Sequence, residues 1–172
     1  GKTAEILVFL IGAMTIVEIV DYFNGFSVFQ KIINFKTKKA ILWVFSGLAF
    51  ILSAIIDNLT ATIVLISILQ KVVSDKNLRI WYAALIVIAA NAGGAWSPIG
   101  DVTTTMLWIG DKVSTPMLIQ YLLIPSIACA VAATGIASLL PAFKGEIKLN
   151  PVKDEGNKYS FRMLTLGLGS IV

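Results

Sequence analysis

Apolar residues fill four long runs of this chain, and a short polar segment separates each run from the next. The runs cover residues 4–20, 40–69, 80–109 and 117–140. A helix on the surface of a soluble protein would place polar residues on its outer face every few positions, and these runs do not. Because about 20 apolar residues cross a bilayer as a helix, we predict an all-α integral membrane protein with spans over 4–22 and 117–140.

The second run is too long for one upright helix and too short for two complete crossings. It is interrupted by "DNLT", Asp57 to Thr60. It therefore forms either one long helix with a polar kink or a re-entrant hairpin over 40–70 that enters and leaves on the same side. Lysine and arginine collect in cytoplasmic loops, and here they collect in 31–39, 71–79 and 144–162. Only the hairpin places all three basic segments on one side, so we favour it.

The third run contains "ANAGGAWSPIGDVTTTM", residues 90–106. We predict that a helix stops near Asn91, because glycine is common at helix ends and a proline disfavours helical backbone at the residue before it. Asp101 is a good N-cap for a helix that restarts after the interruption. This pattern predicts a broken transmembrane helix over 80–110, with the break near the bilayer midplane. We assign the break to Gly93, Gly94, Pro98 and Gly100.

Two aspartates lie inside these interrupted runs. Asp57 or Asn58 can cap a helical arm beginning near Ala61, and Ser53, one turn earlier, is expected to face the same way. A charged side chain at the bilayer centre costs about 3 kcal/mol on insertion scales, so such residues are usually functional. We therefore expect Asp57 and Asp101 to take part in function.

The rest of the chain is assigned more simply. We predict an interfacial helix over 25–36, a cytoplasmic loop over 143–160 and the start of another span over 161–172, so that the chain is expected to be part of a longer protein. Thr105 and the single cysteine, Cys129, are expected to pack between helices. The net charge of +4 comes from loop lysines and arginines rather than from one basic face, which argues against nucleic acid as a partner.

Two stretches, "SAIIDNLTATIV" and "AANAGGAWSPIGDVTTTMLW", resemble the NhaD-type sodium/proton antiporters of the ion transporter superfamily. The resemblance covers about residues 5–140. It implies an inverted repeat in which each half holds a re-entrant hairpin and a broken helix, and this chain resembles most of the first half. The ion-binding and proton-exchange positions that it implies are Ser53, Asp57, Asn58 and Thr60 in the hairpin, and Asn91, Asp101, Thr103 and Thr104 in the broken helix.

The predicted function is secondary active exchange of Na⁺, or of Li⁺, for H⁺, with Na⁺ bound at Asp57 and Asp101 and with no cofactor and no enzymatic activity. Carboxylate, amide and hydroxyl oxygens suit a hard cation. The alternatives are a superfamily carrier of a dicarboxylate or arsenite anion and, more remotely, an intramembrane aspartyl protease, whose two signatures are absent. Expected partners are the lipid bilayer, the remaining half of the transporter and a second copy in a homodimer. The expected location is the bacterial inner membrane.

Overall fold

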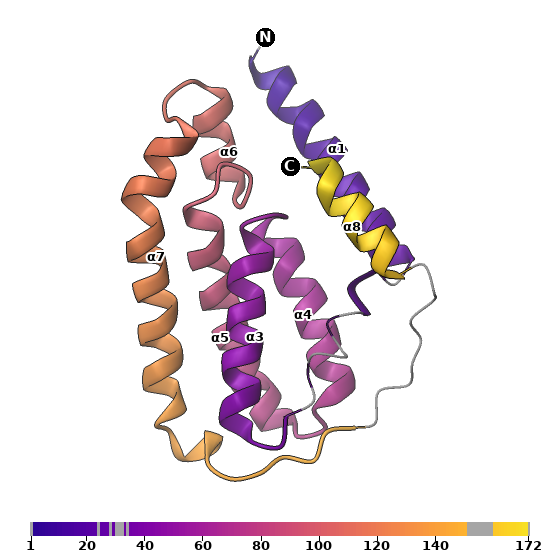
Figure 1. Cartoon of the computed structure of the whole chain (residues 1–172), viewed down its shortest axis with the longest axis vertical. Coiled ribbons are helices and arrows are strands. Elements are labelled where there is room, and N and C mark those ends of the chain that lie inside the picture. The colour runs from indigo at the N-terminus through magenta and orange to yellow at the C-terminus, as the bar shows by residue number, and fades with distance from the viewer. Residues whose placement is uncertain are drawn as a thin grey trace.

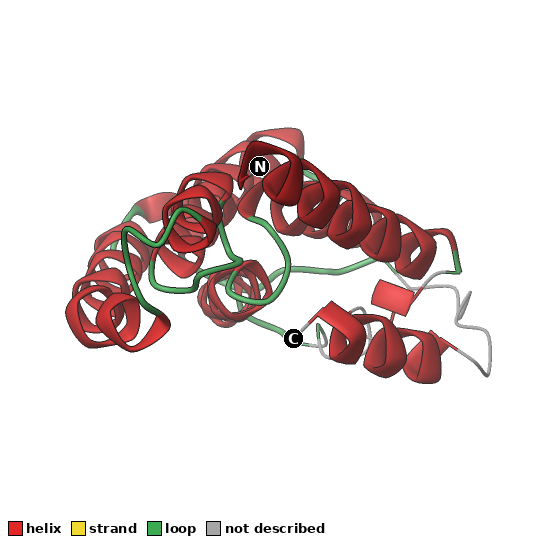
Figure 2. Cartoon of the chain, turned by 90° about the horizontal axis from the view of Figure 1, so that it is seen from above, coloured by secondary structure: helices red, strands yellow, loops and turns green. Residues whose placement is uncertain are grey.

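The computed structural model describes residues 2–171 except 24, 28, 30–32, 34 and 151–159. Figure 2 shows helices joined by loops, without a strand, over these described residues. In chain order the elements are α1 (Lys2–Tyr22), η1 (Gly25–Ser27), α3 (Lys38–Ser53), α4 (Asn58–Val72), α5 (Lys76–Ala95), α6 (Val102–Ile109), α7 (Thr115–Ser138), η2 (Pro141–Phe143) and α8 (Ser160–Ile171).

Helices α3, α4, α5 and α7 pack side by side as the main body, and α1 pairs with α8 beside them (Figure 1). The buried Tyr82 of α5 anchors the lower end of this body. Its ring packs between Phe45 and Phe143, with ring centroids 6.3 Å and 5.3 Å away. Its hydroxyl donates to the Lys38 carbonyl over 2.9 Å, so the large side chain is buried without an unpaired hydroxyl.

The second apolar run folds as an antiparallel helical hairpin of α3 and α4 (Figure 1). Its two ends meet the same segment, residues 145–150. The Lys38 amide donates to the Gly145 carbonyl over 3.3 Å, and the Asn150 amide donates to the Val72 carbonyl over 3.0 Å. One segment thus joins the start of α3 to the end of α4, which rules out a single long helix over this run.

The third run folds as two helices, α5 and α6, separated by residues 96–101. The prediction that α5 stops near Asn91 is wrong, because the helix continues to Ala95. Gly93 and Gly94 are buried inside the helix. A Cβ at Gly93 would collide with the carbonyl of Phe50 in α3, so glycine here permits close helix packing and does not end the helix.

This extension also moves the break. At 1.5 Å per residue, the 20 residues of α5 span about 30 Å and the 8 residues of α6 about 12 Å. The break therefore does not lie midway between the start of α5 and the end of α6. The greater length of α5 arises at both ends, because it begins at Lys76, before the predicted start at residue 80, and ends at Ala95 rather than near Asn91.

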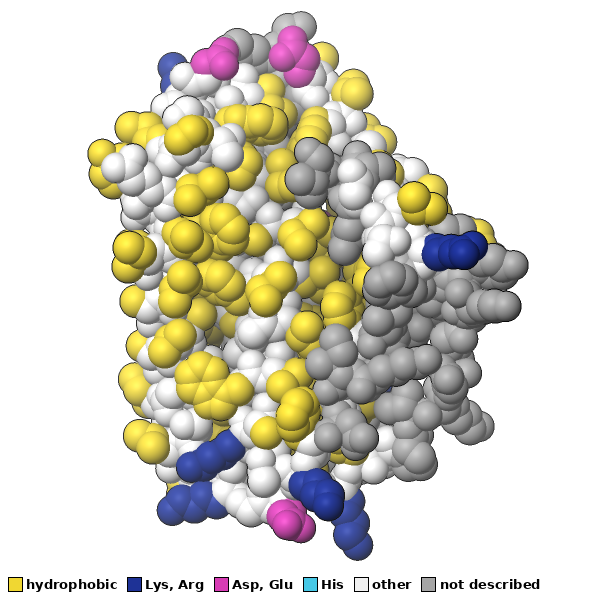
Figure 3. All heavy atoms as spheres, viewed as in Figure 1, with side chains coloured by type: hydrophobic (Ala, Val, Ile, Leu, Met, Phe, Trp, Pro, Cys, Tyr) yellow, Lys and Arg dark blue, Asp and Glu magenta, His cyan; other side chains and the backbone are white. Residues whose placement is uncertain are grey.

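Three helices are long and apolar enough to cross a membrane in the described part of the chain: Thr3–Val20, Lys76–Ala95 and Thr115–Ser138. Apolar side chains cover the middle of the face in Figure 3, while lysines and arginines gather mainly at its lower end. An apolar band between polar ends is typical of a membrane protein.

Other predictions depend on partly described segments. Of the predicted interfacial helix over 25–36, Gly25–Ser27 forms a 3₁₀ turn, and positions 28, 30–32 and 34 lie outside the described residues. Of the predicted loop over 143–160, residues 151–159 lie outside them too. Cys129 is exposed on α7, so the expectation that it packs between helices is wrong within this chain.

Candidate functional site

The tip of the α3–α4 hairpin is organised by Asp57. This residue, one of the two caps that the sequence allowed, is the N-cap of α4 and has extended backbone. One carboxylate oxygen accepts from the Thr60 amide over 2.8 Å and the other from the Thr60 hydroxyl over 2.5 Å. The D-x-x-T pattern places the whole arrangement within four consecutive residues, so a cap in this segment could be predicted from sequence.

Asp101 has the same role at the break between α5 and α6. It is the N-cap of α6, which confirms the prediction. Its Oδ1 accepts from both the amide and the hydroxyl of Thr103, over 2.7 Å and 2.6 Å. The Thr104 hydroxyl donates to the Asp101 main-chain carbonyl over 2.9 Å. Two helix N-termini are therefore each occupied by a carboxylate of the chain itself.

Asn58 connects the hairpin tip to the Asp101 cap. Its Nδ2 donates to Asp101 Oδ2 over 2.7 Å and to Asn91 Oδ1 over 3.0 Å, while the Asn91 Nδ2 donates to the Val87 carbonyl over 2.8 Å. The main-chain amide of Asn58 also donates to the Gly100 carbonyl over 3.1 Å. The first residue of α4 thus contacts both α5 and the break, and it brings the two sequence motifs into one site.

Ser53 lies at the back of the site and is fully buried. Its hydroxyl donates to the Ala90 carbonyl of α5 over 2.6 Å. Gly94 and Gly100 pack against it, since a Cβ at Gly94 would lie 3.0 Å from Ser53 Oγ and one at Gly100 would lie 2.6 Å from the Ser53 carbonyl. Ser53 therefore fixes the end of α3 against α5, where the chain has no room for side chains.

Thr105 is a residue whose part in the site the sequence did not reveal. It is 1% exposed, and its hydroxyl donates to the Pro98 carbonyl over 3.0 Å and to the Asp101 carbonyl over 2.9 Å. These bonds tie the middle of the break to the start of α6. A threonine in an apolar helix is usually explained by packing alone. The bond from Thr105 to the Pro98 carbonyl therefore becomes apparent only from the fold.

A cavity of about 110 Å³ lies between α1, the hairpin tip and the start of α6. Asp57 and Asn58 form the polar part of its wall, and Met14 and Val17 of α1 belong to the apolar part. Cavities that hold water need only about 15 Å³, so this one has room for a small ion with part of its hydration shell. The residues that line it include no lysine or arginine.

The predicted site residues differ in how far their side chains are exposed. Asp57, Asn58, Thr60 and Asp101 are half-buried, Thr104 is buried, and Asn91 and Thr103 are exposed within this chain. Seven of the eight predicted positions belong to two hydrogen-bond groups, and Ser53 belongs to neither. One group holds Asp57 and Thr60, and the other holds Asn58, Asn91, Asp101, Thr103 and Thr104. The fold therefore gathers the two motifs at one level, where carboxylate, amide and hydroxyl oxygens can contact a hard cation.

Known proteins similar to this chain include a transporter family and several antiporters. The sequence model of the citrate transporter family matches residues 3–172. Sodium/proton antiporter 1 of Arabidopsis thaliana is 46% identical over 146 residues, which are 85% of this chain and 25% of that protein. Sodium/proton antiporter 2 of the same plant is 44% identical over 145 residues, 84% of this chain and 34% of the relative.

A bacterial relative, the Na⁺/H⁺ antiporter NhaD of Vibrio parahaemolyticus, is 38% identical over 130 residues, 69% of this chain and 31% of that protein. The chain thus spans between 25% and 34% of the length of these curated relatives. No solved structure matches the chain.

Proposed function

We propose that this chain, which belongs to the citrate transporter family, is part of a secondary transporter that exchanges Na⁺ for H⁺ at Asp57 and Asp101. The chain is an integral membrane protein, as its family and its apolar helices indicate. The observation that carries the proposal is the pair of helix N-termini, each capped by a carboxylate, with Asn58, the residue after Asp57, hydrogen-bonded to Asp101. The names of the relatives support cation/proton exchange.

The charge of the site favours a cation. Helix N-termini carry partial positive charge and are common anion sites in proteins. Here both N-termini already hold an aspartate of the chain, which supplies the negative charge that an anionic substrate would otherwise bring. A sodium ion can be held by carboxylate oxygens together with the Asn58 and Thr103 side-chain oxygens.

An anion carrier is the second candidate, because the family is described by citrate transport. A carboxylate or arsenite substrate would need cationic side chains or free helix N-termini close by. Neither is present among the described residues at the hairpin tip and the break. The anion would have to be bound by residues outside this chain, so cation exchange accounts better for the residues within it.

We place the hairpin in the membrane as a re-entrant element, with its tip inside the bilayer and both ends in the cytoplasm. The positive-inside rule supports this orientation, because the segments around Lys38, Lys71 and Lys144 are joined at one end of the fold. In the full transporter an inverted second half covers the exposed Asn91 and Thr103. The bacterial inner membrane is the location for bacterial members, and a homodimer is the expected assembly.

Exchange requires the two ions to compete. A protonated carboxylate is a poor sodium ligand, and bound sodium favours the charged carboxylate. One shared site that binds either ion can therefore carry sodium outward and protons inward without two pathways. Lithium is a second substrate on the same argument, because it is also a hard cation that prefers oxygen ligands.

The test uses the full-length protein that carries this segment, reconstituted in vesicles with an internal pH dye. Exchange predicts that external NaCl drives protons out of the vesicles and raises the internal pH, whereas external choline chloride does not. Radiolabelled citrate uptake is measured in the same vesicles. Citrate uptake without sodium-driven proton movement would replace the antiport proposal by the anion carrier.

A further inference from the structure

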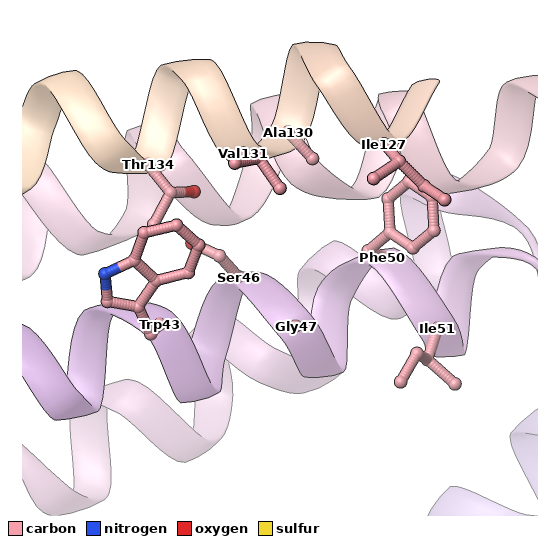
Figure 4. Close-up of a pocket in the computed structure, with 9 residues that line it drawn as sticks. All are labelled: Trp43, Ser46, Gly47, Phe50, Ile51, Ile127, Ala130, Val131 and Thr134. Carbon is pink, nitrogen blue, oxygen red and sulfur yellow. The ribbon is translucent and has the colours of Figure 1, made fainter. Parts of the chain in front are cut away.

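A groove runs along the outside of the bundle between α3 and α7 (Figure 4). Trp43, Gly47 and Ile51 of α3 form one wall, and Ala130 and Thr134 of α7 lie on the other. The groove has a volume of about 180 Å³ and almost entirely apolar walls. Trp43 and Ile51 are 42% and 61% exposed, so the groove opens to the outside of the described chain.

The groove holds one polar atom that the fold leaves unpaired. Ser46 is only 4% exposed, and its Oγ has no hydrogen-bond partner among the described residues. Ser46 lines the groove beside Gly47. Because the Ser46 Oγ itself is closed to solvent, an occupant of the groove meets apolar surface at this level, which suits an acyl chain.

A separate polar hollow lies at the start of α3. It is lined by Lys39 and Lys144 together with Thr37 and Glu146. Lys39 lies four residues before Trp43 on α3, so the two side chains share one face of the helix. The two lysines outnumber the single glutamate, and the hollow therefore favours an anionic group. Tryptophan is also enriched where the apolar layer of a membrane meets the headgroups.

We propose that this groove binds one anionic glycerophospholipid of the cytoplasmic leaflet. Its phosphate lies at Lys39 and Lys144, and an acyl chain follows the groove past Gly47 to Ile51. On α3 the rise from Lys39 to Ile51 is about 18 Å, which leaves room for a headgroup, the glycerol and the upper part of an acyl chain in this order. Anionic lipids are concentrated on the cytoplasmic side, where basic pockets between helices bind their headgroups. The inference rests on membrane insertion and not on the ion that is transported.

The test is tryptophan quenching in the detergent-purified full-length protein. Phosphatidylglycerol or phosphatidylcholine with brominated acyl chains is titrated in, and the part of the quenching lost in a Trp43→Phe variant is assigned to Trp43. Brominated phosphatidylglycerol should quench that part at about one-tenth of the mole fraction that phosphatidylcholine requires, because two lysines attract the headgroup.

Three variants make the test specific. The double variant Lys39→Gln, Lys144→Gln should lose the preference for phosphatidylglycerol, while Lys76→Gln, a lysine of the same end that does not line the hollow, should retain it. Gly47→Leu should remove the Trp43 quenching by both lipids, since a Cβ at Gly47 meets no described atom within 4 Å and the side chain can fill the groove.

Other results would overturn the proposal. Equal quenching by the two lipids would show that Trp43 contacts only nonspecific boundary lipid. A preference for phosphatidylglycerol that survives in the double variant would place the headgroup elsewhere. Absence of quenching by either lipid would mean that a protein segment covers the groove. Competition by millimolar inorganic phosphate, with no dependence on the acyl chain, would make the hollow a phosphate site only.

Discussion

The Nδ2 of Asn58 lies 2.7 Å from Oδ2 of Asp101, although 43 residues separate the two in sequence. This bond connects the hairpin to the broken helix, and it requires the donor side of the amide to face the carboxylate. The orientation is consistent with the second bond from Nδ2 to Asn91 Oδ1. Asn58 therefore positions Asp101, and its own Oδ1 accepts no hydrogen bond from the residues that the structure describes.

The first prediction concerns this amide. Asn58→Asp replaces the amide donor by a third carboxylate at the site, beside those of Asp57 and Asp101. Sodium-driven proton movement should be lost because the new carboxylate repels that of Asp101. Asn58→Ala should lose a charge-assisted hydrogen bond, typically worth about 1.5 to 3 kcal/mol, and show reduced exchange. The measurement is dye dequenching in vesicles with the full-length variants. Asn77→Asp, at the exposed start of α5, is the control and should exchange normally.

The second prediction separates a charged ligand from a helix cap. Asp57→Asn and Asp101→Asn keep a capping side chain, since asparagine caps as well as aspartate does, but they remove the charge. Exchange should fall to background while the protein still inserts. Asp75 caps α5 through the Leu78 amide at 3.0 Å and lies outside the site, so Asp75→Asn should remain active. Wild-type exchange in both site variants would leave these aspartates with a capping role alone.

The local features of the site could be predicted, and the long-range ones could not. The caps at Asp57 and Asp101 depend on residues at most three positions away, so the sequence contains all the required information. The hairpin followed from loop charge, which is a property of whole segments. The bond from Asn58 to Asp101 and the bond from Thr105 to the Pro98 carbonyl depend on how helices meet, which no local pattern specifies.

Gly93 and Gly94 also show that a local sequence pattern does not specify how helices pack. Glycine before a proline is typical of a helix end, and the sequence was interpreted in that way. Tertiary packing decided otherwise, because α5 approaches the Phe50 carbonyl and the Gly100 carbonyl too closely for any Cβ. The end of α5 was therefore predicted four residues too early, although the existence of the break was predicted correctly.

The third prediction tests this packing. Gly93→Ala should destabilise the full-length protein by about 1 to 3 kcal/mol, the usual effect of overpacking, because backbone of α3 and not a movable side chain is the neighbour. Gly135→Ala is the matched control on α7, where a Cβ meets nothing within 4 Å, and it should be neutral or slightly stabilising. Thermal unfolding in detergent measures both. Equal melting temperatures for the two variants would contradict the close approach of α3 and α5.

The fourth prediction is topological. In a Cys129→Ser background of the full-length protein, cysteines placed at Thr37 and Ser74 should both react with an impermeant thiol reagent from the cytoplasmic side. A cysteine at Ser114, in the α6–α7 connection, should react from the opposite side. All three positions are exposed, so accessibility does not limit labelling. Reaction of positions 37 and 74 from opposite sides would be incompatible with a re-entrant hairpin.

The last prediction concerns competition between the two ions. If one proton must leave the Asp57 and Asp101 site for each sodium ion bound, the apparent sodium affinity should weaken about tenfold per pH unit in the acidic range where the site is protonated. It should become constant at higher pH, where the site is already free of the proton.

The sign follows from linkage: protons bind the sodium-free form better, so lowering the pH favours that form and opposes sodium. If the two carboxylates share the exchanged proton, the midpoint of the change belongs to the pair and not to one residue. The sodium concentration for half-maximal exchange, measured in the full-length protein between about pH 6 and pH 9.5, gives this dependence. A constant value over that range, with proton transport intact, would show that protons cross by a route separate from the sodium site.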